Sequence, residues 1–304
     1  MPRKKTAKPT GPSKHREKLD LIDTQRGKLP HAYQIAFRSL RIMWSNRLLL
    51  GGIAAIYGVL YLAFGQALTS LSGANLSGAF TRAFNGHPGS LFSGFNLFVL
   101  LIGSGGSNAS SSANAYRTFL FLAVSLAVIY VLRTVMSGGT TKFRDAFYKG
   151  MYPLIPFILV IVWLAVEFIP LVVAGFLYSL SQNAGVAVNL FDNIILDIVF
   201  LLIASVSFYF VTSGVFAAYI VTLPDMTPMK AIRSARTIVK KRRLVVFAKL
   251  AFLPAFVLVI GAILMVPFIL LMKPVISIVF IILSLIFFEF MHTYLYSLYR
   301  ELIE

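Results

Sequence analysis

Hydrophobic positions along this chain gather into long runs that are separated by shorter polar and basic stretches. A helix needs about 20 apolar residues to cross the roughly 30 Å hydrocarbon core of a bilayer. Each run that reaches this length predicts a membrane-spanning helix, and these runs cover residues 48–71, 117–136, 152–178, 191–222, 245–272 and 275–298. The pattern therefore predicts an all-α, polytopic membrane helix bundle with six transmembrane helices.

Composition supports a membrane-embedded chain. Hydrophobic residues make up 58% and charged residues 13%, where a soluble domain carries about 25% charged residues. Residues 1–29 are the exception, because they are basic and poor in apolar side chains, which predicts a disordered cytoplasmic tail. Residues 30–304 are then one six-span membrane domain. Cysteine is absent, which excludes disulfides and thiolate metal sites.

The distribution of positive charge predicts the orientation. With the N-terminus inside, every Lys and Arg except Arg82, Arg117 and Lys273 lies in the tail or on the inner side of the six-span arrangement. Cytoplasmic loops of membrane proteins carry such an excess of positive charge. We therefore expect a multi-pass protein of the plasma (inner) membrane with both termini cytoplasmic. A net charge of +17 beside membrane spans favours anionic lipid headgroups, and not nucleic acid, as the partner.

One further apolar run, 91–102, tests this orientation. It is only about half as long as a span requires. If it did cross, the basic segments around Lys142 and Lys240 would lie outside. We interpret it as an interfacial or re-entrant part of an outer loop, 72–116.

A short basic stretch precedes each outward-going span. The three stretches share an Ala followed by an apolar residue and two mostly polar ones: AFRS at 36–39, AFYK at 146–149 and AIRS at 231–234. This spacing indicates a repeated unit, a short amphipathic helix followed by two spans, used three times.

The third stretch is the clearest. Thr227 can cap a helix and Pro228 suits its first position, where no backbone donor is needed, so the helix is predicted to start at Thr227. Its apolar side chains, Ile232, Ala235 and Val239, share one face. Such a helix is expected to lie in the membrane plane, with that face in the acyl boundary.

The basic residues of this stretch are the predicted lipid-headgroup surface. They are Lys230, Arg233, Arg236, Lys240, Lys241, Arg242 and Arg243. Each basic residue near an anionic membrane contributes about 1 kcal/mol of attraction. The alternative, that these charges only set the topology, is compatible with headgroup binding.

The Thr-Pro pair, the AIRSA sequence at 231–235, Val239 and the basic cluster at 240–243 resemble a known loop. It is found in the membrane domain joined to some bacterial glycerophosphoryl diester phosphodiesterases, and in YciC-type inner-membrane proteins. The resemblance implies an α-helical, non-catalytic membrane domain. The soluble catalytic barrel of the phosphodiesterases has no counterpart here, so no catalytic residue carries over.

Ionisable side chains inside spans are costly and mark candidate sites. Glu167 and Asp197 are predicted to share the outer half of the bilayer on neighbouring antiparallel helices. Two carboxylates at one depth could hold a proton or a cation, which predicts an ion- or proton-coupled transporter. The alternative is that each carboxylate is hydrogen-bonded or paired separately within the bundle.

Glu289 and His292 lie three residues apart and therefore on one helical face. An E-x-x-H pair is half of a di-metal motif that needs a second E-x-x-H and two further Glu residues, and the chain lacks them. We expect a local polar pair, with Arg133 as a neighbour, and no metal.

Signatures of hydrolases, zinc proteases and phosphate-binding loops are also absent from the sequence. The sequence thus favours a non-enzymatic protein of the cell envelope without a cofactor, which interacts with lipid or assists a partner. Small residues at four-residue spacing, such as Gly51/Ala55, Ala54/Gly58 and Gly214/Ala218, predict close helix packing within the chain or in a homo-oligomer.

Overall fold

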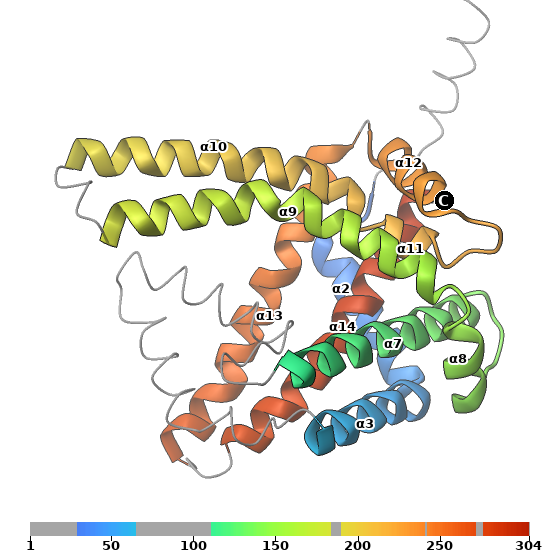
Figure 1. The fold of residues 1–304 in the computed structure, drawn as a ribbon. Coiled ribbons are helices and arrows are strands. Elements are labelled where there is room, and N and C mark those ends of the chain that lie inside the picture. The colour runs from blue at the N-terminus through green and yellow to red at the C-terminus, as the bar shows by residue number, and fades with distance from the viewer. Residues whose placement is uncertain (1–28, 65–110, 184–189, 241, 272–275, 304) are drawn as a thin grey trace, which may run out of the picture.

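The structure is a computed structural model, and it describes residues 29–64, 111–183, 190–240, 242–271 and 276–303. Every regular element in these residues is a helix, as the hydropathy pattern predicts (Figure 1). The helices are α2 (Ala32–Ser45), α3 (Arg47–Phe64), α7 (Ser111–Met136), α8 (Phe143–Gly150), α9 (Leu154–Asn183), α10 (Leu190–Gly214), α11 (Ala217–Ile220), α12 (Pro228–Val239), α13 (Arg243–Leu271) and α14 (Ile276–Ile303).

Within the described residues, five helical segments are long and apolar enough to cross a membrane. A sixth is reached only if α2 and α3 are counted as one span, although they meet at 86°. The chain is thus a multi-pass membrane protein, and its six-span count stays a prediction. The basic tail up to residue 28, the short run 91–102 and the outer loop as far as residue 110 lie outside the described residues.

One predicted span contains a short turn, although Phe191–Ile220 still counts as one candidate span. The run 191–222 forms α10 and the short α11, with a turn after Gly214. The hydroxyls of Thr212 and Ser213 donate to the carbonyls of Phe208 and Phe210. Such side-chain bonds to the preceding turn bend helices, and Gly weakens a helix further. Both effects fall where α10 ends.

The three short basic stretches are all helices, α2, α8 and α12, as predicted. The first residue of each repeated stretch, Ala36, Ala146 and Ala231, is fully buried in all three. No larger side chain would allow such close approach of the helix to its neighbour. The shared Ala therefore marks the docking point of each short helix.

These helices dock in a cyclic order. α8 packs on α7, the second span of the preceding unit, and α12 packs on α10 and α11, the second span of the unit before it. α2 has no preceding unit and packs on α14, the last span. The first span of each unit also contacts the second span of the preceding unit. α9 contacts α7, α13 contacts α10, and α3 contacts α14. The sequence repeat thus closes in space as a ring of three units.

The start of α12 confirms the predicted capping. Thr227 has an extended backbone, its side chain accepts a hydrogen bond from the Lys230 amide, and Pro228 is the first helical residue. The apolar face of α12 is placed differently from the expectation: Ile232, Ala235 and Val239 are buried against the protein and not free to enter the acyl boundary. The reason is that α10 and α11 cover that face.

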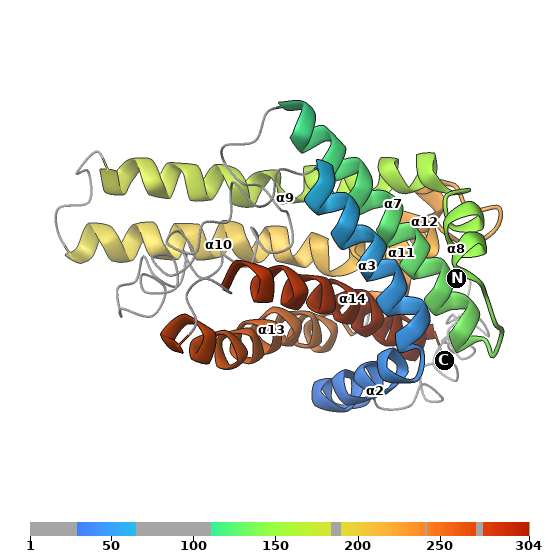
Figure 2. The same cartoon turned by 90° about the horizontal axis from the view of Figure 1, so that it is seen from below.

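The spans differ strongly in how much of their surface is buried by other helices. The buried core runs through α7 and α14, and the α9–α10 hairpin projects away from the α13–α14 hairpin (Figures 1 and 2). Only 17% of the apolar window of each of these two helices is buried, and many of their side chains are exposed apolar groups. In a membrane protein such faces suit contact with lipid chains.

Candidate functional site

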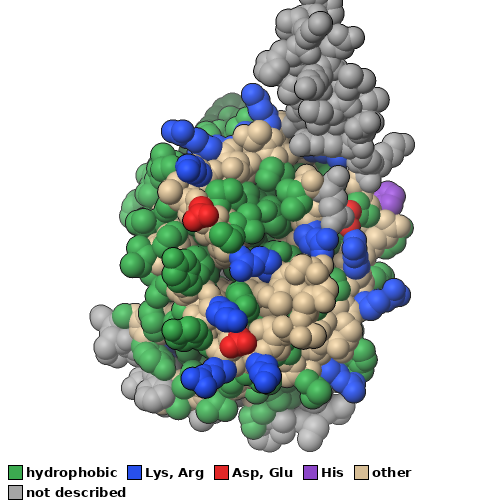
Figure 3. Space-filling view, turned by 90° about the vertical axis from the view of Figure 1, so that its right-hand side faces the viewer, with side chains coloured by type: hydrophobic (Ala, Val, Ile, Leu, Met, Phe, Trp, Pro, Cys, Tyr) green, Lys and Arg blue, Asp and Glu red, His purple; other side chains and the backbone are tan. Residues whose placement is uncertain are grey.

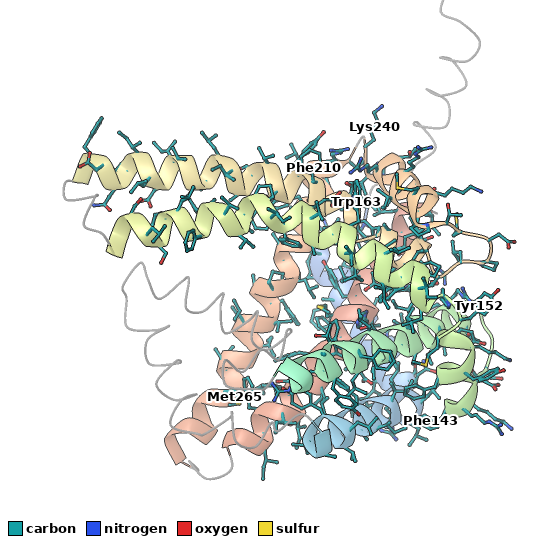
Figure 4. The ribbon with its side chains drawn as sticks, viewed as in Figure 1. Phe143, Tyr152, Trp163, Phe210, Lys240 and Met265 are labelled. Carbon is teal, nitrogen blue, oxygen red and sulfur yellow. The ribbon has the colours of Figure 1, made fainter. Side chains whose placement is uncertain are left out.

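Glu167, halfway along α9, lies in a polar cluster beneath α12. Its Oε1 atom is 3.1 Å from an Arg236 guanidinium nitrogen and accepts a 3.0 Å hydrogen bond from the Trp163 indole. The Arg236 guanidinium also lies 5.9 Å from the Trp163 ring centroid. Figure 4 shows Trp163 on the half of α9 nearer to α12. One charged residue of the amphipathic helix therefore reaches an intramembrane carboxylate.

The two members of this ion pair are unequally buried. The Glu167 side chain is 7% exposed and that of Arg236 is 40% exposed. The second carboxylate oxygen of Glu167, Oε2, is buried without a hydrogen-bond partner. The backbone of α10 approaches it closely, because a Cβ on Gly214 would lie 2.4 Å from Oε2. Gly214 thus gives Glu167 the room to turn toward α12.

Asp197 is placed far from Glu167. It precedes Gly214 on α10 by about 25 Å at 1.5 Å per residue, while Gly214 is the residue opposite Glu167. Asp197 is exposed and lies one turn from Phe200, whose ring packs with Tyr178 of α9 at 5.6 Å. The two carboxylates therefore do not form one site. Counting residues from the predicted span ends placed the two carboxylates at one depth. α9 extends to Asn183, beyond the predicted end at 178, so Glu167 lies farther from the α9–α10 connection than the count assumed.

Glu289 and His292 are both buried in the core on α14, at 4% and 7% exposure. The His292 Nδ1 atom is 3.2 Å from the hydroxyl of Tyr219 on α11, and its ring packs edge-to-face on Phe288 at 4.7 Å. Glu289 Oε1 and His292 Nε2 have no hydrogen-bond partner. The structure thus buries this predicted pair on one face of α14 and places the His292 ring beside Tyr219.

Arg133 is not the partner of that pair. Its guanidinium donates a 2.6 Å hydrogen bond to the carbonyl of Thr222 and lies over the ring of Tyr130. Thr222 follows the end of α11 at Ile220, so no helix continues there to supply a backbone donor to its carbonyl.

The predicted headgroup surface divides into three parts. Lys230 and Arg233 on α12 and Lys240 directly after it are exposed, whereas Arg236 turns to Glu167. Arg243 stacks on Tyr209 of α10, with its guanidinium carbon 4.0 Å from the ring centroid. Arg242 is half-buried, and Lys241 lies outside the described residues.

Other exposed basic side chains join Lys230, Arg233 and Lys240 at the end of the molecule that carries α8, α12 and the C-terminus (Figures 1 and 3). We call this surface the basic end; it consists of Arg41 on α2, Lys142, Arg144 and Lys149 at α8, and Lys230, Arg233 and Lys240 at α12. Few acidic side chains interrupt it in Figure 3. Asp145 of α8 lies 3.8 Å from Lys149.

A second ionic cluster at α2 was not predicted from the sequence. Arg38 forms an ion pair with Glu301 near the end of α14. Lys249 of α13 is buried, and it donates to the carbonyl of Pro30 just before α2. The hydroxyls of Ser39 and Ser297 complete the α2–α14 contact at 3.3 Å. The sequence signal that could have found this cluster is the placement of Lys249 inside an apolar run.

Among the described residues, no group of three or more His, Asp or Glu side chains could hold a metal ion. No protein-family model matches this chain, and neither does any curated protein or solved structure. The resemblance of the α12 loop to the phosphodiesterase-linked membrane domain therefore stays a prediction from the sequence.

Proposed function

We propose that this chain is a non-enzymatic envelope protein of the bacterial inner membrane whose basic end binds anionic lipid headgroups. The observation that carries the proposal is the division of α12 into a buried apolar face and an exposed basic one. Because the protein itself holds the apolar face, the lysines and arginines are fixed at one level of the bilayer. A fixed positive surface concentrates anionic lipid around the protein and can organise the membrane there.

The other short helices support the same proposal. α2 meets α3 at 86°, so an α3 that crosses the bilayer would leave α2 along the membrane surface. Arg41 of α2 and Arg144 of α8 are exposed as on α12. The ring of three docked helices thus presents basic groups around the whole inner end. Transport by a Glu167–Asp197 site is not supported, because those side chains lie far apart and Glu167 is paired with Arg236.

Headgroup binding is tested by neutralising the exposed charges of α12. The triple variant Lys230→Gln/Arg233→Gln/Lys240→Gln is expected to lower the affinity for anionic lipid about fivefold per residue, because each charge contributes about 1 kcal/mol. The measurement is enrichment of a labelled phosphatidylglycerol around the full chain in nanodiscs, at two salt concentrations. High salt should reduce the difference between wild type and variant.

Thr237→Gln is the matched control, because Thr237 is exposed on the same helix and carries no charge. It should enrich phosphatidylglycerol as the wild type does. Equal enrichment by the triple variant would reject the proposal. In proteoliposomes we expect no proton or cation flux; a flux that Glu167→Gln abolishes would favour the transporter instead.

The orientation has a separate test, which the absence of cysteine makes simple. Single cysteines at Thr140 and Met229, both exposed near the basic end, are expected to resist a membrane-impermeant maleimide in intact cells and to react after permeabilisation. A cysteine at Phe191, exposed at the far end of α10, is expected to react in intact cells. The opposite labelling would place the basic end outside and overturn the proposal.

A further inference from the structure

The core of the bundle contains a polar pair that headgroup binding does not use. Glu289 and His292 lie one turn apart on α14, and both are more than nine-tenths buried. Glu289 Oε1 and His292 Nε2 are each without a hydrogen-bond partner. The large majority of buried polar atoms have a hydrogen-bond partner, and the bilayer core offers no bulk water as a substitute. Glu289 Oε1 and His292 Nε2 lie on one helical face, so their missing hydrogen bonds point to an interaction that joins the two side chains.

No cation of the described residues pairs with Glu289. The ion pairs found there join Arg38 to Glu301, Lys149 to Asp145 and Arg236 to Glu167. An ionised carboxylate buried without a cation is strongly disfavoured. Glu289 is thus best satisfied as the neutral acid, in contrast to Glu167, which lies in a comparable span and has its arginine.

The imidazole supplies the complementary partner. His292 Nδ1 already bonds the Tyr219 hydroxyl. A neutral imidazole has one donor and one acceptor nitrogen. If the tyrosine donates to Nδ1, Nε2 is a donor and suits the acid's carbonyl oxygen; if Nδ1 donates, Nε2 is an acceptor and suits the acid's hydroxyl. Either tautomer therefore matches Glu289.

We propose that Glu289 and His292 form a proton-binding site in the membrane core, in which Glu289 carries one proton and is hydrogen-bonded toward His292 Nε2. Side chains three residues apart on a helix have Cβ atoms about 5–6 Å apart. The two atoms do not bond directly, and the link included in this proposal is one bridging water molecule.

The surroundings isolate this site from bulk water. The Phe288 ring packs on His292, and it is itself covered by Tyr57 of α3 at 5.4 Å and Phe121 of α7 at 5.3 Å. The titratable and charged groups on these packed helices, apart from the pair itself, are Arg47, Tyr57 and Tyr61 on α3, Tyr116, Arg117, Tyr130 and Arg133 on α7, Tyr219 on α11, Arg243 and Lys249 on α13, and Tyr294, Tyr296, Tyr299, Arg300 and Glu301 on α14. Arg133 donates to Thr222 and Lys249 to Pro30. A proton on Glu289 is thus retained by the acid–imidazole bond.

Infrared spectroscopy of the full chain in lipid bilayers tests the proposal. At neutral pH the wild type is expected to show a protonated-carboxyl band that shifts when glutamate is 13C-labelled. Glu289→Gln should remove the band. His292→Phe should move it to higher frequency, because the acid loses a hydrogen-bond partner. Glu167→Gln is the matched control and should leave it unchanged, since that carboxylate is ion-paired.

A wild type without a 13C-sensitive carboxyl band, a band that survives in Glu289→Gln, or a band unmoved in His292→Phe would each overturn the proposal. The labelled wild type gives a result even if a variant fails to fold. The site is independent of headgroup binding, because none of its residues lies on the basic end. A failure of lipid enrichment therefore leaves the carboxyl-band test valid, and a missing carboxyl band leaves the test of headgroup binding valid.

Discussion

Arg236→Ala is expected to lower the free energy of unfolding by about 3 kcal/mol, the cost of removing one partner of a buried ion pair. The variant leaves the Glu167 carboxylate, 7% exposed, without its cation in the middle of a span. Unfolding in a graded series of denaturing detergent measures the effect. Arg233→Ala is the matched control, because Arg233 lies one turn earlier on α12 and is exposed; we expect less than about 0.5 kcal/mol there.

The two partners are expected to behave unequally. Glu167→Gln should cost less than Arg236→Ala, because Arg236 is 40% exposed and can turn toward water. The double variant Glu167→Gln/Arg236→Ala should be more stable than Arg236→Ala alone, since no charge is left buried. Equal stability of Arg236→Ala and Arg233→Ala would mean that the pair does not hold α12 to α9.

Gly150→Leu is expected to destabilise the fold by about 2–3 kcal/mol through overpacking. Gly150 ends α8 where that helix touches α7, and a Cβ there would lie 3.2 Å from the Ala127 Cα and from the Leu126 carbonyl oxygen. These are backbone atoms of a buried span, so they cannot move aside cheaply. The same detergent unfolding assay measures the loss.

Gly51→Leu is the control for this substitution. Gly51 lies in α3, and a Cβ added there meets nothing within 4 Å. Because Gly is a poor helix former, this variant should be neutral or more stable by up to about 1 kcal/mol. A stability loss at Gly51 as large as at Gly150 would mean that the effect belongs to the residue type and not to the α7–α8 contact.

Helix positions were predictable because they depend on local properties. Apolar length predicted where α9, α13 and α14 lie, and the Thr227 cap predicted the start of α12 to the residue. The turn after Gly214 was not predicted, since apolar residues continue on both sides of it. Hydropathy reports burial in lipid and does not distinguish a continuous helix from one with a short turn.

The small-residue pairs were predicted as packing sites without their partners. Gly58 lies against Leu285 of α14, where an added Cβ would be 2.7 Å from a methyl carbon, and Gly214 lies against α9. Both contacts are within the chain. Gly51, in the same apparent motif, has open space. The spacing shows which helix face can approach closely, but the topology decides which helix lies there.

The residues of the candidate site also separate into features that the sequence predicts and contacts that only the fold decides. The sequence determined by itself that this is an all-helical membrane protein with three short basic helices and buried ionisable groups, because hydropathy, capping and charge are read from neighbouring residues. Only the tertiary structure decided that Arg236 faces Glu167, that Asp197 lies far from it, and that the three helices close a ring. These contacts join segments far apart in the chain, and only packing brings such segments together.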